Sequence, residues 1–324
     1  MAEWLVERGI GETRAALVED GAIVEARITL DGTVEAGTVI AAQLIDIGPR
    51  GGNSNGRNAI ARDAQGQEYL LPTLERGVTE GAALAIEVTR EVIPGGEAWK
   101  RPRARTTAAA PAPAPPLAAT ELPFPPHGRD ALADAGWDDV VEEARSGHVE
   151  FGGGSLTLFA TPAMTLIDVD GNLPPAELAV AGAAAAAQAI RRLGLGGSIG
   201  IDLPTVAGKA PRLAAAEAVD AILPQPFERT TVNGFGFLQI IRPRPRASLL
   251  EIWADRAAAE ARALLRRAAL SGPGARRLAA HPAVIGQLEA NPAWTAALAR
   301  QIGGAVTLRA DLSLAISGGH AEPA

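Results

Sequence analysis

The sequence contains no cysteine, which excludes disulfides, thiolate zinc sites and cysteine nucleophiles. Aromatic residues make up only 4% of the chain, and its few histidines are scattered without metal-ligand spacing. No apolar run reaches the roughly 18 residues that a membrane-spanning helix requires. No positively charged leader with a following apolar core opens the chain, so we expect a cytoplasmic protein without membrane contact.

The residues that are present are typical of a globular protein with more than one domain. The 324 residues are 47% hydrophobic and 21% charged, which is enough for two or three compact units. A net charge of −7 argues against non-specific coating of nucleic acid. Positive charge nevertheless concentrates in KRPRAR (Lys100 to Arg105) and RPRPR (Arg242 to Arg246). Either run could follow a phosphate backbone or form a solvated loop.

The first third of the chain is predicted to be all β. Residues 1–32 indicate a hairpin that turns at Glu19-Asp20-Gly21. Short strands separated by Gly-rich turns follow over residues 33–105 and favour a small barrel of the oligonucleotide-binding type, an OB-fold. Residues 106–128 form a Pro/Ala linker that should be extended, with few contacts of its own.

The remaining two thirds are predicted to be α/β. Strands and helices alternate over residues 129–247, and residues 248–324 hold one long helix, Leu249 to Leu270, and a small α/β unit. The last residues, GGHAEPA, are expected to be disordered. The predicted fold class is therefore a multidomain α/β (α+β) protein with an N-terminal hairpin and barrel.

Two aspartates follow short β-branched runs in the segment 129–247. Asp168 ends such a run in MTLIDVD, Asp202 ends another in GSIGIDLP, and the residues between them favour one helix. A strand–helix–strand unit places parallel strand ends side by side, so the two carboxylates should meet at one edge of a sheet. Asp170 would lie on the same face if its strand continues.

Paired carboxylates favour a hard divalent cation, because one or two carboxylates and several waters usually hold Mg²⁺. Such an ion lowers the pKa of a bound water and neutralises charge that develops on a phosphodiester. We expect Asp168 and Asp202 to hold Mg²⁺, with Mn²⁺ as the alternative metal and no zinc. Asp170 would assist through a water or by orienting a carboxylate. Aspartate is also common at strand ends as a cap or turn residue, which leaves a purely structural role open.

Three stretches resemble, in sequence and order, the catalytic subdomain of the bacterial ribonuclease E/G family. They are GGGSLTLFATPAMTLIDVDG, AGAAAAAQAIRRLGLGGSIGIDLP and NGFGFLQIIRPR, within about Asp138 to Arg246. Weaker similarity extends to the family's hairpin, OB-fold and C-terminal small domain. The resemblance implies a DNase I-like catalytic subdomain, with Asp168 and Asp202 as the Mg²⁺-binding catalytic pair. Asp170 stands where the family usually has Asn.

The resemblance also implies contacts with RNA. Lys100 falls near the OB-fold lysine that contacts RNA, and Tyr69 or Leu70 falls near a base-stacking aromatic. Tyr69 or Trp99 is therefore expected to stack on a base, and the two basic runs are expected to bind phosphates. The predicted phosphate-binding residues are Lys100, Arg101, Arg103, Arg242 and Arg244.

The sequence departs from the family pattern in several places. The linker and one helix replace the family's region for sensing a 5′-monophosphate, so recognition of the 5′ end is expected to be absent. The family's Cys-x-x-Cys zinc link is missing, so any homo-oligomer would form without it. Gly234, Gln239 and Thr205 replace an arginine and two acids of the family, and Ile60 replaces an OB-fold aromatic.

Three hypotheses follow for function. The leading one is a metal-dependent endoribonuclease of RNA processing that cleaves single-stranded RNA, leaving a 5′-phosphate and a 3′-hydroxyl as the resemblance implies. The alternative is an RNA-binding homologue with weak or no catalytic activity. The third is an assembly component that uses the helix Leu249 to Leu270, although its apolar residues suit packing on its own domain as well.

Overall fold

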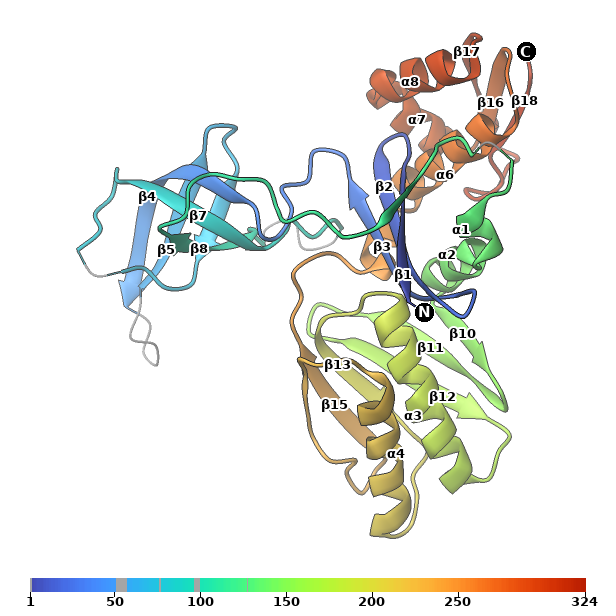
Figure 1. Cartoon of the computed structure of the whole chain (residues 1–324). Coiled ribbons are helices and arrows are strands. Elements are labelled where there is room, and N and C mark those ends of the chain that lie inside the picture. Colours follow the sequence, from blue (N-terminus) through green and yellow to red (C-terminus); the bar gives the residue numbers. More distant parts are fainter. Residues whose placement is uncertain (1, 51–56, 76, 96–99, 127) are drawn as a thin grey trace.

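The described residues form a mixed α/β structure with a closed five-stranded barrel and three sheets. The structure is a computed structural model that describes residues 2–50, 57–75, 77–95, 100–126 and 128–324. Figure 1 shows the barrel standing apart from the sheets and connected to them by extended segments. Within the part of the chain that the structure describes, no helix combines the length and the apolar character needed to cross a membrane.

The N-terminal strands form an antiparallel meander. It consists of β1 (Glu3–Arg8), β2 (Glu12–Glu19) and β3 (Ala22–Leu30), which pair in sequence order. Asp20 and Gly21 adopt φ angles of 50° and 82° between β2 and β3. Positive φ at both turn residues matches the twist of a hairpin, so the turn lies where the sequence predicts it.

The closed barrel follows the meander along the chain. Its strands are β4 (Val39–Arg50), β5 (Arg57–Asp63), β6 (Glu68–Leu71), β7 (Ala83–Arg90) and β8 (Arg103–Thr107), in the order β4-β5-β6-β8-β7. Apolar side chains that include Leu44, Leu71 and Ile86 fill its interior. This core is separate from the core beneath the sheets.

The Pro/Ala-rich segment makes more contacts than the sequence predicts. Its end forms β9 (Thr120–Leu122), which pairs in parallel with β1. The Arg8 guanidinium lies 2.8 Å from the Glu121 carboxylate, and Ala112 forms an isolated bridge with Val39. Without β9, β1 would be an edge strand with unpaired backbone groups. Because β9 contains no proline, its backbone can form hydrogen bonds with those groups.

The largest sheet carries the predicted aspartates. Its order is β10-β11-β12-β13-β15-β14, and only β12 and β13 within it are parallel. Strand β10 is absent from the sequence-based prediction. The strands are β10 (His148–Phe151), β11 (Gly154–Ala160), β12 (Thr165–Gly171), β13 (Gly197–Asp202), β14 (Glu228–Arg229) and β15 (Phe237–Arg242).

Two helices cover one face of this sheet, as Figure 1 shows. They are α3 (Pro175–Arg192) and α4 (Lys209–Ile222), and the shorter α1 (Ala131–Asp134) and α2 (Trp137–Ser146) precede the sheet. Helix α3 approaches β12 closely, because a Cβ atom at Gly182 would lie 2.3 Å from Cγ1 of Val169. The small residues of α3 therefore set how near it lies to the sheet.

The C-terminal part differs from prediction in two places. The prediction of a single helix over Leu249 to Leu270 is wrong, because the helix is interrupted at Asp255. The Asp255 side chain accepts a hydrogen bond from the Ala258 N–H and so caps the start of a second helix. The expected disorder of the last residues is also wrong, because β18 pairs with β16. The elements are α5 (Leu249–Ala254), α6 (Arg256–Leu270), β16 (Arg276–Ala280), α7 (Pro282–Ala290), α8 (Pro292–Ile302), β17 (Val306–Ala310) and β18 (His320–Pro323).

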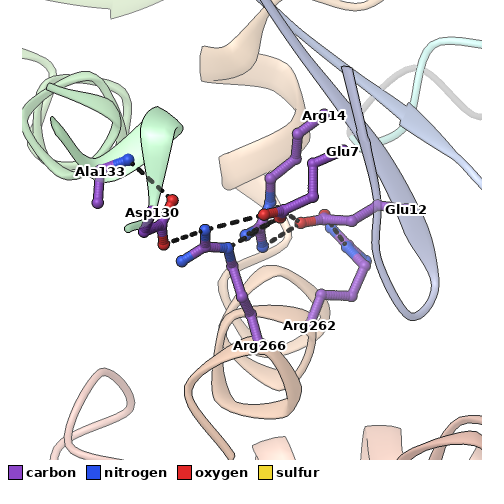
Figure 2. A network of polar contacts seen from close by, with 7 residues as sticks. All are labelled: Glu7, Glu12, Arg14, Asp130, Ala133, Arg262 and Arg266. Carbon is purple, nitrogen blue, oxygen red and sulfur yellow. Dashed lines mark hydrogen bonds and ion pairs between the residues drawn. The ribbon is translucent and has the colours of Figure 1, made fainter. Parts of the chain in front are cut away.

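A buried ionic network joins the meander to α6 and to the start of α1 (Figure 2). Glu12 lies between Arg14 and Arg262, with a distance of 2.8 Å to each Nε atom. Arg266 lies between Glu7 and Asp130, at 3.0 Å and 2.6 Å. The charges balance, as buried charges require. The network consists of Glu7, Glu12, Arg14, Asp130, Arg262 and Arg266.

Substitution of Glu12 by Gln should destabilise the fold, because it leaves two buried guanidinium groups without their shared carboxylate. We expect a loss of about 3–5 kcal/mol in the free energy of unfolding, measured by thermal and urea denaturation at neutral pH. The matched control is Glu121→Gln, which breaks an exposed pair with Arg8 and should cost less than about 1 kcal/mol. Equal losses in the two variants would contradict this role of the network.

The same network predicts a dependence of stability on pH. Burial would raise the pKa of Glu12, but the guanidinium groups of Arg14 and Arg262 outweigh it and hold that pKa below its usual range. The stabilisation from Glu12 is therefore complete above the ordinary glutamate pKa and is lost as the pH falls below it. The difference in melting temperature between the wild type and Glu12→Gln should narrow over that acid range, and a constant difference would count against the assignment.

Candidate functional site

Asp168 and Asp202 lie opposite one another on two parallel strands. They are register partners at the ends of β12 and β13, so their Cα atoms are roughly one strand spacing, about 4.8 Å, apart. Their neighbours Ile167 and Ile201 are buried against the helices, which directs both aspartates to the other face of the sheet. Both side chains are exposed there. The structure brings together the pair that the sequence predicts to meet.

Asp170 lies on the same face, because β12 continues to Gly171. It is two residues beyond Asp168 and is exposed, whereas Val169 between them is buried. In register, Asp170 lies beside Ser155 and Asp168 lies beside Thr157 on strand β11. The three carboxylates therefore form an acidic end of the open face, bordered by two hydroxyl side chains.

The electrostatics of this acidic end are unfavourable in the protein alone. The pKa of Asp168 is raised, first by partial burial and then by the nearby negative charges of Asp170 and Asp202. Within the described residues, neither a lysine nor an arginine forms an ion pair with any of these three carboxylates, whereas arginines pair with acids elsewhere in the fold, such as Glu12 and Asp220. A bound cation would relieve this repulsion.

The donor set suits a hard divalent cation. Carboxylate oxygens from Asp168 and Asp202 meet the requirement of Mg²⁺ for one or two carboxylates, with the remaining positions left to water and phosphate oxygens. No group of three or more His, Asp or Glu side chains able to hold one ion is found in the described ranges. Asp170 accordingly fits the role of a neighbour that binds a water or orients Asp168, rather than that of a third ligand.

An exposed aromatic residue that the sequence analysis passes over lies in the turn that packs against the end of the Asp202 strand. Phe235 is 84% exposed, at a turn that precedes Phe237, the register partner of Asp202. The Asn233 side chain accepts hydrogen bonds from the Phe235 and Phe237 N–H groups, and Thr205 donates to the Phe235 carbonyl. The Asn-Gly-Phe-Gly sequence signals this turn but does not reveal that the phenyl ring faces solvent.

The turn is fixed tightly against the strand end that holds Asp202. Gly236 has a φ of +94°, and a Cβ atom there would lie 2.1 Å from the Leu203 carbonyl oxygen, so only glycine fits. Phe159, 52% exposed on β11, adds a second aromatic surface. The ring of Phe237 lies over Gly200, where a Cβ atom would approach its Cζ to 2.5 Å. Apolar rings thus adjoin the acidic end.

The predicted phosphate-binding residues divide into two groups. Arg242 pairs in register with Gly197, whereas Asp202 pairs with Phe237, five residues earlier on β15. Arg242 and Arg244 are therefore separated from the aspartates by roughly 16 Å along the strand. Lys100, Arg101 and Arg103 lie on the barrel, where Arg101 forms an ion pair of 2.7 Å with Glu68. The structure does not bring either group beside the aspartate pair.

Tyr69, the first of the two predicted stacking residues, is not at the site. Tyr69 is 1% exposed inside the barrel, and its hydroxyl group donates to Asp63 at 3.1 Å, so its ring cannot stack on a base in this conformation. Burial raises the pKa of this tyrosine. The alternation of β6 directs Tyr69 inward, and Leu70 takes the outward position. Trp99, the other candidate, lies outside the described residues.

Two residues at which the sequence differs from the ribonuclease E/G pattern have structural roles here. Gln239 donates to the Ser198 hydroxyl at 3.1 Å across β13 and β15. Thr205 holds the Phe235 turn. No protein-family model matches the sequence, and a comparison with curated proteins finds no match. The relation to ribonuclease E/G therefore remains a prediction from the motifs.

Replacement of Asp168 by Asn should stabilise the free protein. Because the pKa of Asp168 is raised in the folded state, its ionised form opposes folding at neutral pH, and removal of the charge should add at most about 1 kcal/mol. The gain should vanish below the ordinary aspartate pKa, where the wild-type carboxylate is protonated in both states. Thermal denaturation over a pH series measures this difference, with the exposed Asp31→Asn as control.

Magnesium should make the wild type more stable than Asp168→Asn, the reverse of their order without metal. Millimolar Mg²⁺ should raise the melting temperature of the wild type, because a ligand that binds only the folded state stabilises it, and should leave Asp168→Asn unchanged. Absence of any Mg²⁺ or Mn²⁺ effect on the wild type would remove the metal assignment.

Proposed function

We propose that this protein is a metal-dependent endoribonuclease that cleaves single-stranded RNA. The observation that carries the proposal is the register pairing of Asp168 with Asp202 on an open sheet face, without a basic partner among the described residues. In this proposal the barrel is an OB-fold that holds RNA, and the largest sheet with α3 and α4 is a DNase I-like catalytic subdomain. The motif resemblance to the ribonuclease E/G family supports both assignments.

The residues of the acidic end would divide the chemistry among them. Asp168 and Asp202 would hold a divalent cation, which when bound lowers the pKa of a coordinated water and neutralises charge on the scissile phosphate. Asp170 would orient Asp168 or accept a proton from a water at the site. The products would carry a 5′-phosphate and a 3′-hydroxyl, as the family resemblance implies, without sensing of a 5′-monophosphate by the family's own region.

The surroundings of the aspartates suit an unpaired strand better than a duplex. Phe235 and Phe159 present exposed rings within one or two strands of the pair, and stacking on such rings requires unstacked bases. Arg103 is exposed on β8 and would contact phosphates along the barrel. These contacts would bind RNA with little sequence preference, because every base has a face that can stack.

Loss of either metal-binding carboxylate should abolish cleavage. In a gel assay with a labelled single-stranded RNA and Mg²⁺, Asp168→Asn and Asp202→Asn should each lower the rate by roughly 100-fold or more, because each removes charge stabilisation at the transition state. Asp170→Asn should cost roughly 10–100-fold, as expected for a residue that orients a ligand. Asp31→Asn should cleave like the wild type.

The same assay, combined with a binding assay, separates the endoribonuclease from the inactive RNA-binding homologue. A wild-type protein that retains RNA in a filter-binding or anisotropy assay, yet shows no metal-dependent cleavage, would be the inactive RNA-binding homologue. The replacements at Gly234, Gln239 and Thr205 favour that alternative, because charged residues of the family are lost there. A metal-dependent cut that survives both aspartate substitutions would place the catalytic residues elsewhere.

Phe235 should contribute to RNA affinity through base stacking. Truncation in Phe235→Ala should weaken binding by about 1–3 kcal/mol, which corresponds to an increase of roughly 5- to 150-fold in Kd. Fluorescence anisotropy in EDTA measures binding without cleavage. Leu312→Ala removes a comparably exposed apolar side chain, 82% exposed in the C-terminal part, and should leave the Kd unchanged. Equal effects of the two substitutions would exclude a specific stacking role.

A further inference from the structure

A pocket lined by five arginines lies at the end of the largest sheet opposite the aspartate pair. Its volume is about 260 Å³, several times the ~30 Å³ that one water occupies. Only one acidic side chain, Glu25, lines it together with the arginines. We call it the arginine pocket, and its basic residues are Arg27, Arg191, Arg242, Arg244 and Arg246.

Three separate parts of the chain build the arginine pocket. Arg27 comes from β3 of the meander, Arg191 from the last turn of α3, and the others from the end of β15 and the segment after it. Backbone contacts fix this arrangement. The Arg242 guanidinium donates to the Leu195 carbonyl at 3.1 Å, and the Glu91 N–H donates to the Pro245 carbonyl at 2.8 Å. The guanidinium groups are thus held by the fold and not by one flexible loop.

Three of the five arginines have carboxylate partners. Arg27 pairs with Glu25 at 2.6 Å and also lies 4.2 Å from the centre of the Trp4 ring. Arg244 pairs with Glu251, and Arg191 lies 3.7 Å from Glu19. These pairs neutralise part of the charge but leave guanidinium N–H groups available toward the pocket, because each guanidinium carries five donors.

Arg242 and Arg246 lack such partners. Among the described residues no carboxylate lies within ion-pair distance of either, and Arg246 forms no hydrogen bond there. Both are partly buried. Burial lowers the pKa of both guanidinium groups. For Arg242 the negative charge of Glu25 offsets part of this effect on the pKa and the positive charge of Arg191 adds to it. For Arg246 the positive charge of Arg27 lowers the pKa further. Glu91, Glu25 and Glu35 act on Arg246 only from a longer range.

Partly buried charges of one sign are normally compensated by a counter-charge. We propose that the arginine pocket is a binding site for a phosphate group, separate from the aspartate pair. Several guanidinium groups that converge from three directions match the several oxygens of one phosphate, each of which accepts charge-assisted hydrogen bonds. The phosphate belongs either to RNA or to a small phosphorylated compound, and the chemistry of the pocket is the same for both.

Calorimetric titration with inorganic phosphate at low ionic strength, without divalent metal, tests the site directly. The wild-type chain should bind one phosphate per molecule with saturation. Arg246→Gln should weaken this binding about tenfold or more, because a hydrogen bond to a charged group is lost. The phosphate affinity of Arg246→Lys should lie between the affinities of the wild type and Arg246→Gln. The matched control Arg300→Gln removes one exposed positive charge from α8 and should bind like the wild type.

Folding is checked independently by circular dichroism and melting temperature. Arg246→Gln should keep the wild-type circular dichroism spectrum and a cooperative melting transition, because Arg246 forms no ion pair or hydrogen bond with the other described residues. Lack of saturable phosphate binding by the wild type would overturn the proposal. An equal loss in Arg300→Gln would overturn it too, because the binding would then follow net charge and not the pocket.

Anisotropy with labelled single-stranded RNA in EDTA identifies the source of the phosphate. A loss of affinity in Arg246→Gln for 5′-phosphorylated RNA alone assigns a terminal phosphate, and an equal loss for 5′-hydroxyl RNA assigns an internal phosphodiester. Unchanged RNA binding together with lost phosphate binding assigns a small phosphorylated compound. None of these measurements involves cleavage, so the pocket can be confirmed or rejected whatever the outcome of the nuclease assay.

Discussion

The buried ionic network between the meander and helix α6 is the interaction on which the relative placement of the parts depends. Glu12, Arg14 and Arg262 are each no more than 5% exposed, and their charges are satisfied within this network, where Arg14 also pairs with Glu7. Such networks add little net stability compared with apolar packing, because desolvation offsets the attraction. Their contribution is specificity, since any shift of the meander along α6 would leave a buried charge without its partner.

Charge is distributed in this chain so that the two ends of one sheet have opposite character. Acidic side chains that have no basic partner among the residues the structure describes collect at the carboxyl ends of β12 and β13, whereas guanidinium groups collect where β15 ends. A protein with a net charge of −7 thereby keeps one cationic surface away from its acidic one. A polyanion can therefore be attracted to the cationic surface without being repelled by the acidic surface at the same place.

The sequence was sufficient wherever local pattern determines structure. The strand–helix–strand unit that sets Asp168 beside Asp202 follows from two apolar runs, an alanine-rich helix and their order. Features that depend on distant partners were not predicted. The strand of the last residues exists because β16 offers an edge, the break at Asp255 depends on a cap, and Tyr69 faces inward because the barrel closes around it. The ionic network and the exposure of Phe235 likewise require the assembled fold.

Because β9 pairs with β1, the barrel is inserted in the sequence between two strands of the same sheet. Residues 31–119 leave the meander after β3 and come back to its far side, so the barrel is an insertion within a chain whose two flanking strands belong to one sheet. Its hydrophobic core shares no residue with the core that supports the aspartates. The barrel can therefore be exchanged, shortened or lost in evolution while the scaffold of the acidic end stays intact.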